Sequence, residues 1–211
     1  MKRVAATDQR KDLQAVRRLA IVDAARTIFF EFGFGGASMN AIAARIGGSK
    51  TTLWAYFATK DLLFEAVVDD LVERYGSVIE GVALDSADVA GTLRHFGLAV
   101  LETVTSTEVM ALHRLVVAEA ERFPALGLSY FRKGPGRALE RLARFFADVA
   151  RGGLLAVEDP DRAAAYFLAM CETGGAQSLL LGLEAPLAPQ RLGKDVDEAV
   201  RTFCRAFAKR G

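Results

Sequence analysis

Hydrophobic positions recur at intervals of three and four residues along most of the chain, which is the spacing of an amphipathic helix. The first such stripe predicts a helix over about residues 12–33 that ends near Gly33, since glycine is common just after a helix. Its apolar positions are Leu13, Val16, Ala20, Ala24, Ile28 and Phe32. Strand signals are few and no repeat of fixed period is present. The pattern therefore predicts an all-α protein.

Three further helical patterns follow closely. Ser38 is a predicted N-cap for a short helix that the Gly47–Gly48 pair ends. Ser49 is the predicted cap of a third helix that contains Leu53, Tyr56 and Phe57. Thr59 is the predicted cap of a fourth helix, from Lys60 to about Val78. This stretch is expected to consist of helices joined by tight turns.

The rest of the chain is also predicted to be helical, with longer helices that begin at proline or at capping residues. Residues 184–194 are predicted to be a loop. The predicted helices cover about residues 87–104, a Thr105/Glu108 capping box to Arg122, 124–134, 135–152, 160–183 and 195–209.

The composition is that of a globular protein, with 211 residues of which 52% are hydrophobic. The longest apolar run, residues 163–171, is far shorter than the roughly 20 residues of a membrane-spanning helix. The N-terminus lacks the apolar core of a signal peptide, so a soluble cytoplasmic protein without membrane contact is expected. Cys171 and Cys204 are expected to be buried thiols, with a redox role as the alternative.

Charge is divided unevenly along the chain. Residues 1–60 carry ten Lys or Arg against four Asp or Glu, a net charge of +6, and residues 61–211 carry a net charge of −5. A basic N-terminal part on an acidic body indicates that only the N-terminal part meets a polyanion. The basic residues of the first eleven positions are expected to form a frayed tail, with an arm in the minor groove as the alternative.

Signals of catalysis or metal binding are lacking. The glycines of residues 33–40 follow a predicted helix, whereas a dinucleotide-binding loop follows a strand. His95 and His113 lie 18 positions apart, with no Cys or paired carboxylate at a ligand spacing. We therefore expect no enzyme activity, no metal and no cofactor.

The segment Ser38–Phe57 has the layout of a helix-turn-helix, in which the second helix enters the major groove of DNA. Its hydroxyl and cationic side chains suit phosphates and base edges. A corner that only packed two helices would not need so many of them on one short helix. The alternative is a solvated surface in a helical scaffold that binds another protein.

The same residues resemble a known family. The run "AARTIFFEFGFGGASMNAIAARIGGSKTTLWAYFATKDLLFEAV" is similar to the N-terminal domain of TetR-family bacterial transcriptional regulators. The resemblance rests on "FFEFGF", on Ser38 before "AIAARIG" and on "SKTTLWAYFATKDLL". Gly48, Thr51 and Trp54 depart from the residues common in the family, which leaves the operator sequence open.

The resemblance implies specific DNA contacts. Ser38, Thr52, Tyr56 and Lys60 would contact phosphates, and Asn40, Lys50, Thr51 and Trp54 would face base edges. Ser49 belongs to the same predicted surface, whereas Leu53 and Phe57 are expected to be core residues. The implied partner is double-stranded DNA. Since one recognition helix contacts few bases, a homodimer that binds a palindrome is expected, with half-sites roughly 34 Å apart.

Residues 112–153 resemble the C-terminal domain of the AefR-like subgroup. We therefore expect a DNA-binding domain over residues 1–65 and a ligand-binding and dimerisation domain over residues 66–211. An unidentified small, lipophilic effector would bind among the middle helices. For each candidate pocket residue, an ordinary core position is the favoured alternative. The candidates are Phe96, Val100, Thr103, Met110, His113, Val117, Phe145, Phe167, Met170 and Cys171.

The resemblance implies that the last two long helices of each subunit, about residues 160–183 and 195–209, pair across the dimer. The alternative for their apolar stripe is burial within one subunit. The candidate interface residues are Ala164, Gly175, Val200, Phe203 and Phe207. The sequence thus predicts a TetR-like repressor that an effector releases from its operator, with an activator or a corepressor-dependent regulator as alternatives within the same class.

Overall fold

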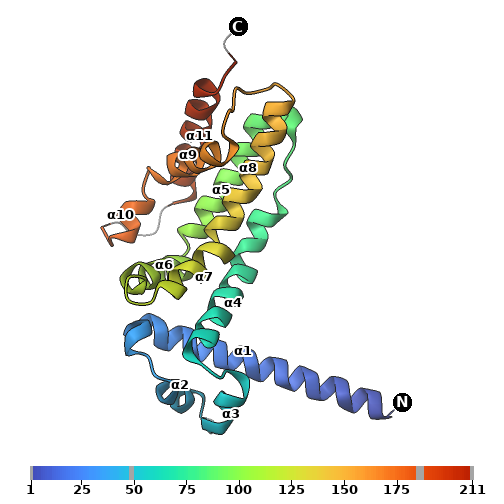
Figure 1. The fold of residues 1–211 in the computed structure, drawn as a ribbon, viewed down its shortest axis with the longest axis vertical. Coiled ribbons are helices and arrows are strands. Elements are labelled where there is room, and N and C mark those ends of the chain that lie inside the picture. The colour runs from blue at the N-terminus through green and yellow to red at the C-terminus, as the bar shows by residue number, and fades with distance from the viewer. Residues whose placement is uncertain (1, 48–49, 184–187, 210–211) are drawn as a thin grey trace. The chain divides into compact units, whose positions relative to one another are not determined.

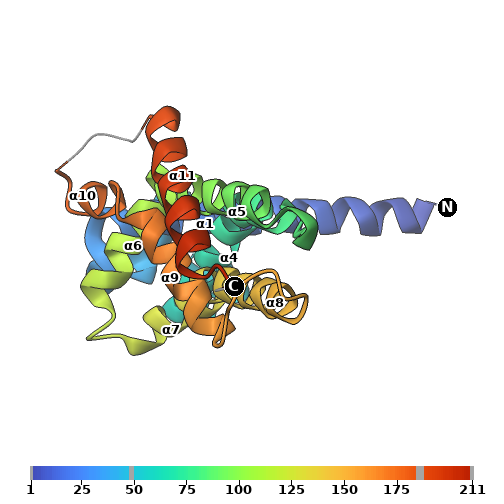
Figure 2. The same cartoon turned by 90° about the horizontal axis from the view of Figure 1, so that it is seen from above.

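The computed structural model consists of helices joined by short connections (Figures 1 and 2). It describes residues 2–47, 50–183 and 188–209, with side chains from residue 13 onward. No strand occurs within these ranges, which confirms the all-α prediction. The α-helices are α1 (Lys2–Gly36), α2 (Met39–Ile46), α3 (Lys50–Tyr56), α4 (Lys60–Gly81), α5 (Val89–Val104), α6 (Thr107–Glu119), α7 (Pro124–Lys133), α8 (Pro135–Arg151), α9 (Pro160–Glu172), α10 (Ala176–Leu180) and α11 (Pro189–Ala206), with a 3-10 turn, η1 (Ser86–Asp88), before α5.

The chain folds into two compact units. The first unit contains residues 1–70 and 112–130, and the second contains residues 71–111 and 131–211. Helices α4 and α6 each begin in one unit and end in the other. The functional boundary predicted between residues 65 and 66 stays a prediction. Among the described residues, none of the helices has both the length and the apolar composition needed to cross a membrane.

The core of the first unit is built around three mutually packed phenylalanine rings. The ring centroids of Phe29 and Phe34 lie 5.7 Å apart, and Phe64 of α4 lies 5.8 and 5.6 Å from them. All three side chains are at most 2% exposed. Edge-on and tilted ring contacts of this kind add to the free energy of burial. They fix the last turns of α1 against the first turns of α4.

The second unit is a bundle in which α8 packs against α9, and α11 packs against both α5 and α9. Phe203 of α11 lies at its centre, with its ring centroid 4.8 Å from that of Phe146, 5.5 Å from Phe167 and 4.4 Å from Phe207. Arg141 of α8 donates to carbonyl oxygens at the end of α4, those of residues 79 and 82. The bundle thus also anchors the C-terminal end of α4.

Several predicted helix ends are confirmed. The Ser38 hydroxyl accepts a hydrogen bond from the Ala41 amide, and Gly47 ends α2 in the left-handed conformation. Thr59 Oγ1 accepts from the Leu62 amide at 3.2 Å, which caps α4. Pro135 occupies the first turn of α8, and Asp159 caps α9.

Other predicted boundaries are wrong. Helix α1 begins at Lys2 instead of residue 12, because residues 2–12 contain no Gly or Pro and many good helix formers. The backbone of these residues therefore continues α1 instead of forming a frayed tail. The predicted helix 160–183 is broken after Glu172, at the glycine pair 174–175, and α10 follows as a separate element.

The final helix and the capping box also differ from their predictions. Helix α11 begins at Pro189, inside the predicted loop, because proline suits the first turn of a helix. The hydroxyl of Thr105 donates to the Leu101 carbonyl, so this residue ends α5 and does not cap α6. Glu108 instead accepts a hydrogen bond from the Tyr75 hydroxyl at 2.7 Å.

Close packing at Gly97 on α5 provides a test of the second unit. A Cβ atom at this position would lie 2.9 Å from Val196 Cγ1 and 3.2 Å from Cys171 Sγ. We expect Gly97→Ala to lower the free energy of unfolding by about 1–3 kcal/mol through overpacking. The matched control is Gly193→Ala on α11, where the added methyl meets nothing within 4 Å and should stabilise the helix by up to about 1 kcal/mol. Urea unfolding compares the two, and equal midpoints would contradict the packing.

Burial controls the chemistry of the two thiols. It raises the pKa of Cys171 to about 12, with a smaller contribution from the Glu172 carboxylate, and it also raises the pKa of Cys204. Because the thiolate is the reactive form, alkylation at about pH 8 should be slow in the folded protein and fast in urea. The half-buried Cys204 should react before the buried Cys171. Mass spectrometry of the labelled peptides measures both rates, and fast native labelling of Cys171 would argue for the redox role.

Candidate nucleic-acid interface

Helix α2 is framed at both ends by polar groups. The Ser38 hydroxyl lies 3.1 Å from the Ala41 amide nitrogen, and the Gly47 amide donates to the Ala44 carbonyl. The positive φ of 66° at Gly47 turns the chain sharply out of α2, which glycine tolerates without strain. Helices α2 and α3 then pack against each other, so the predicted helix–turn–helix arrangement is formed. The predicted contact residue Ser49 lies between them, outside the described residues.

The seven-residue helix α3 has two distinct sides. Leu53 is 2% exposed and Phe57, just after the helix, is 4% exposed, which confirms both as core residues. Lys50 and Thr51 are exposed, and Trp54 exposes 48% of its surface. Because residues three and four apart share one face of a helix, these three side chains form a single outward face. An exposed tryptophan beside a lysine and a threonine is unusual for a purely structural corner.

The remaining predicted contacts lie at the beginning of α2 and on α3. Ser38 and Asn40 are exposed, and Thr52 and Tyr56 are half-buried. The Ser38 oxygen accepts from the backbone, but its O–H remains able to donate to a phosphate. The structure thus brings these residues onto the same two short helices as the face of α3.

Lys60 has a different environment from Lys50. Its ammonium donates to the Phe34 carbonyl at 2.6 Å and to the Ala37 carbonyl at 2.9 Å, and it lies 4.4 Å from the centroid of the Phe34 ring. Residues 34–37 form one helical turn after the kink at Gly33, closed by a hydrogen bond from the Ala37 amide to the Gly33 carbonyl. We call this element the 34–37 turn. It leads directly into the cap of α2, so Lys60 ties α4 to the start of the helix-turn-helix.

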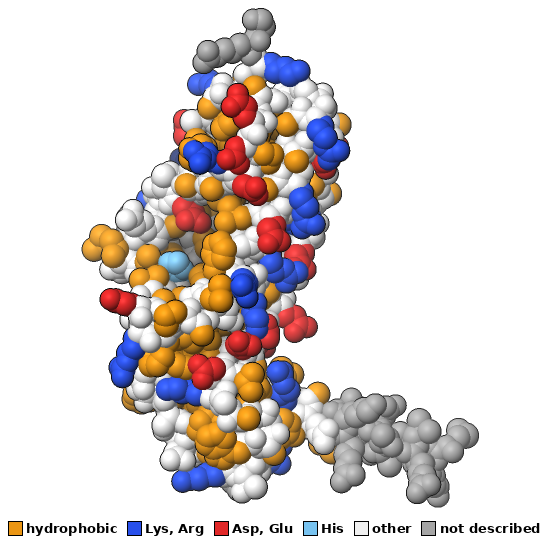
Figure 3. All heavy atoms as spheres, in the orientation of Figure 1, with side chains coloured by type: hydrophobic (Ala, Val, Ile, Leu, Met, Phe, Trp, Pro, Cys, Tyr) orange, Lys and Arg blue, Asp and Glu red, His pale blue; other side chains and the backbone are white. Residues whose placement is uncertain are grey.

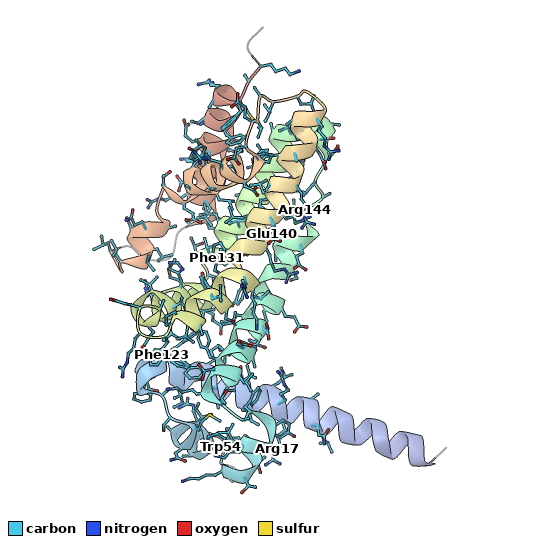
Figure 4. All side chains as sticks on the ribbon, in the orientation of Figure 1. Arg17, Trp54, Phe123, Phe131, Glu140 and Arg144 are labelled. Carbon is cyan, nitrogen blue, oxygen red and sulfur yellow. The ribbon has the colours of Figure 1, made fainter. Side chains whose placement is uncertain are left out.

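Part of the positive charge of the N-terminal segment is neutralised internally. Arg26 forms ion pairs with Asp23 at 2.7 Å and with Asp70 at 3.1 Å. The guanidinium of Arg18 lies 5.2 Å from the centroid of Phe57, where it covers the end of α3. Arg17 is exposed on α1 and was missed as a candidate contact; Figure 4 labels it together with Trp54. Only the charge count of the N-terminal segment pointed to it.

Most of the predicted pocket residues lie in the interior of their own unit. Phe96, Val100, Phe145, Phe167 and Cys171 belong to the core of the second unit, Met170 packs against it, Met110 is buried, and Thr103 is half-buried and donates to the Tyr75 carbonyl. His113 and Val117 lie in the first unit. His113 contacts the Tyr130 hydroxyl at 3.1 Å, burial lowers the pKa of its imidazole, and Val117 is 62% exposed.

A recess of about 340 Å³ opens on the second unit, lined by Leu84, Ser86, Arg141, Arg144, Phe145 and Asp148. Among the predicted pocket residues, Phe145 lines it. Elsewhere on this unit, acidic and basic side chains are interspersed on the face drawn in Figure 3. Because only one predicted pocket residue lines this recess, the effector pocket stays a prediction.

The predicted interface residues are largely covered within the single chain. Ala164 and Phe203 have no exposed surface, Gly175 is buried and Val200 is 8% exposed. Phe207 is half-buried against the same core. The apolar stripe of α11 therefore packs inside one subunit, which was the alternative interpretation. A role of these five residues in a dimer stays a prediction.

Comparison with known proteins gives matches over most of the chain. Residues 21–67 match the bacterial regulatory proteins of the tetR family, and residues 91–209 match the AefR-like transcriptional repressor C-terminal domain. Among curated proteins, the HTH-type transcriptional regulator RutR of Escherichia coli K12 is 30% identical over 95 residues, which are 45% of this chain and 45% of RutR. The match thus spans about half of the length of that relative.

Solved structures extend the similarity to nearly the whole chain. The flavonoid-responsive regulator FrrA is 29% identical, with a TM-score of 0.81 over 93% of this chain and 100% of that chain. A TetR-family regulator from Mesorhizobium loti MAFF303099 is 27% identical, with a TM-score of 0.79 over 92% and 98% of the two chains. With an exposed, polar face on the second helix of a helix-turn-helix and family matches over both parts of the chain, this protein belongs to the TetR family of bacterial DNA-binding transcriptional regulators, a family without enzymatic activity, and has an AefR-like C-terminal domain.

Proposed function

We propose that this regulator is a repressor that binds a palindromic operator as a homodimer and is released by a small, lipophilic effector. The observation that carries the proposal is the outward face of α3, where Lys50, Thr51 and Trp54 are exposed on a helix whose other side is buried. The match to an AefR-like repressor domain supports repression. An activator or a corepressor-dependent regulator would use the same face and differ in its response to the effector. A repressor of chromosomal genes would act in the cytoplasm.

The exposed residues divide by chemistry into two sets. Lys50, Thr51 and Asn40 suit base edges, because lysine donates to guanine, the threonine methyl contacts thymine and asparagine pairs with adenine. Trp54 offers an apolar ring to the groove. Ser38, Thr52 and Tyr56 carry hydroxyl groups that donate to phosphate oxygens. Base contacts would set the operator sequence, and phosphate contacts would set the position on the duplex.

Lys60 has a mainly structural role in this proposal. A lysine ammonium has three donors, and two of them are used by backbone carbonyls of the 34–37 turn. One donor remains for a phosphate. Its removal should therefore reduce folding stability as well as DNA affinity.

A homodimer would place two copies of α3 one helical turn of DNA apart, roughly 34 Å. The contact would use outward faces of the last long helices, since the apolar stripe of α11 is covered within the chain. Tyr166 on α9 is 49% exposed and is flanked by the exposed Ala165. A symmetric contact of this kind would repeat the same surface from both subunits.

The effector is proposed to act by a shift between two states of the dimer. The name of FrrA, a structural relative, describes it as flavonoid-responsive, which supports a small aromatic molecule as the effector class here. Helix α4 runs from the first unit into the second, where Arg141 holds its end. A hundredfold loss of operator affinity would require a coupling free energy of about 2.7 kcal/mol.

Selection of bound fragments from genomic DNA, followed by fluorescence anisotropy on the enriched palindrome, tests DNA recognition. We expect Lys50→Ala to weaken operator binding by about 1–3 kcal/mol and to relax the preference at one position of each half-site. Tyr56→Phe removes a phosphate donor and should weaken binding to every sequence by about 0.5–1.5 kcal/mol. Arg144→Ala on α8 is the control and should bind as the unmodified protein does. Failure to enrich any palindrome would refute the proposed function.

Comparison of two lysine variants separates structural from contact roles. Lys60→Ala leaves two backbone carbonyls without their charged donor, so we expect the free energy of unfolding to fall by about 1.5–3 kcal/mol. Lys50→Ala changes an exposed side chain and should stay within about 0.5 kcal/mol. Urea unfolding measures both. Unchanged stability in the Lys60 variant would contradict its structural role.

A further inference from the structure

A segment far along the chain is part of the first unit. Residues 112–130, from the middle of α6 into α7, cluster with residues 1–70. The ring of Phe123 lies edge-on to Phe34, with the centroids 4.9 Å apart (Figure 4 labels Phe123). The helix-turn-helix is therefore supported by residues outside its own sequence motif.

Glu119, the last residue of α6, makes a polar contact with the N-terminal part of this unit. Its Oε1 accepts a hydrogen bond from the Gly35 amide at 3.0 Å. Gly35 lies at the start of the 34–37 turn, where amide groups have no partner within the turn. Such amides are usually capped by a side chain of the preceding Ser, Thr, Asp or Asn. Here the preceding residue is Gly33, which has no side chain, and Glu119 takes over its role from 84 positions away.

Two glycines make room for this carboxylate. A Cβ atom on Gly33 would lie 2.6 Å from Glu119 Oε1, and one on Gly35 would lie 3.3 Å from Oε2. Gly33 also has a φ of 71°, which side-chain-bearing residues rarely adopt. The glycines of "GFG" thus serve the kink and the approach of Glu119 together. Lys60 holds the carbonyl side of the same turn, so the turn lies between an anion at its amide end and a cation at its carbonyl end.

We infer that Glu119 is a positioning residue for operator binding: it caps the 34–37 turn and thereby sets the angle at which α2 and α3 leave α1. The inference rests on the proposed function and concerns its regulation. Helix α6 begins at Thr107 in the second unit and ends at Glu119 in the first. A shift of α6 along its axis would withdraw the carboxylate from Gly35 and loosen the turn ahead of α2.

Whether removal of the Glu119 carboxylate weakens or strengthens operator binding distinguishes a positioning role from a simple charge effect. Glu119 carries a negative charge in a DNA-binding unit, so if charge alone mattered, its removal would strengthen binding to the polyanion. If the carboxylate positions the turn, its removal weakens specific binding. Glu121 is the matched control, because it is an exposed acid two positions further along. Glu119→Gln keeps an oxygen acceptor and should show an intermediate effect.

The experiment compares full-length Glu119→Ala, Glu119→Gln and Glu121→Ala. Operator affinity is measured by anisotropy at several salt concentrations, and hydrogen exchange of the 33–38 amides by mass spectrometry. We expect Glu119→Ala to weaken operator binding about five- to tenfold, as for loss of a helix cap, with an unchanged salt slope. Exchange at residues 33–38 should become faster while α8 keeps its protection. Glu121→Ala should bind equally or slightly more tightly.

Operator binding by Glu119→Ala as tight as that by Glu121→Ala would overturn the inference. Unchanged exchange at residues 33–38 would do so as well, because the turn would then be held without the carboxylate. If the unmodified protein selects no operator, the proposed function fails, but the exchange measurement still decides whether Glu119 holds the turn. A loss of affinity accompanied by faster exchange throughout α8 would mean general unfolding and would also count against positioning.

Discussion

The outward face of α3 depends on the burial of its opposite side. A helix of seven residues is not stable alone in water, because few hydrogen bonds compensate for the cost of starting it. Leu53 and Phe57 supply the missing stabilisation by packing into the core of the first unit. The direction of α3 in turn depends on the 34–37 turn, whose carbonyls are held by Lys60. The exposed residues of α3 are therefore held in position by contacts of Leu53, Phe57 and Lys60, and not by contacts of their own.

Local rules predicted much of the first unit from sequence. Ser38, Gly47 and Thr59 mark helix ends because their short side chains, or the lack of one, act on the nearest backbone groups. Helical spacing explains why Leu53 of α3 and Phe57 just after it are buried, whereas Lys50 is exposed. What local rules miss is the origin of the contacts around the 34–37 turn. Glu119 lies 84 positions from Gly35, and no pattern in the sequence joins them.

The helix boundaries of the second unit were harder to predict, because the same side chains can cap a helix or bond to other groups. Thr105 and Glu108 have the spacing of a capping box, yet the threonine hydroxyl donates to Leu101 and the glutamate accepts from Tyr75. An apolar stripe such as that of α11 has the same appearance whether it covers a neighbouring helix or a second subunit. Phe203 contacts three other rings of its own chain, so at that position the stripe is covered within the chain. The spacing of apolar residues likewise cannot distinguish those that line a pocket from those that fill the core.

The membership of residues 112–130 in the first unit bears on how such regulators can be recombined. Hybrid regulators are naturally built by joining the N-terminal part of one chain to the C-terminal part of another near the start of α4. For this protein, such a junction would leave Glu119 and Phe123 with the discarded half and give Gly33 and Gly35 an unrelated neighbour. The transferable module is discontinuous in sequence, and a working hybrid would have to carry the end of α6 together with the helix-turn-helix.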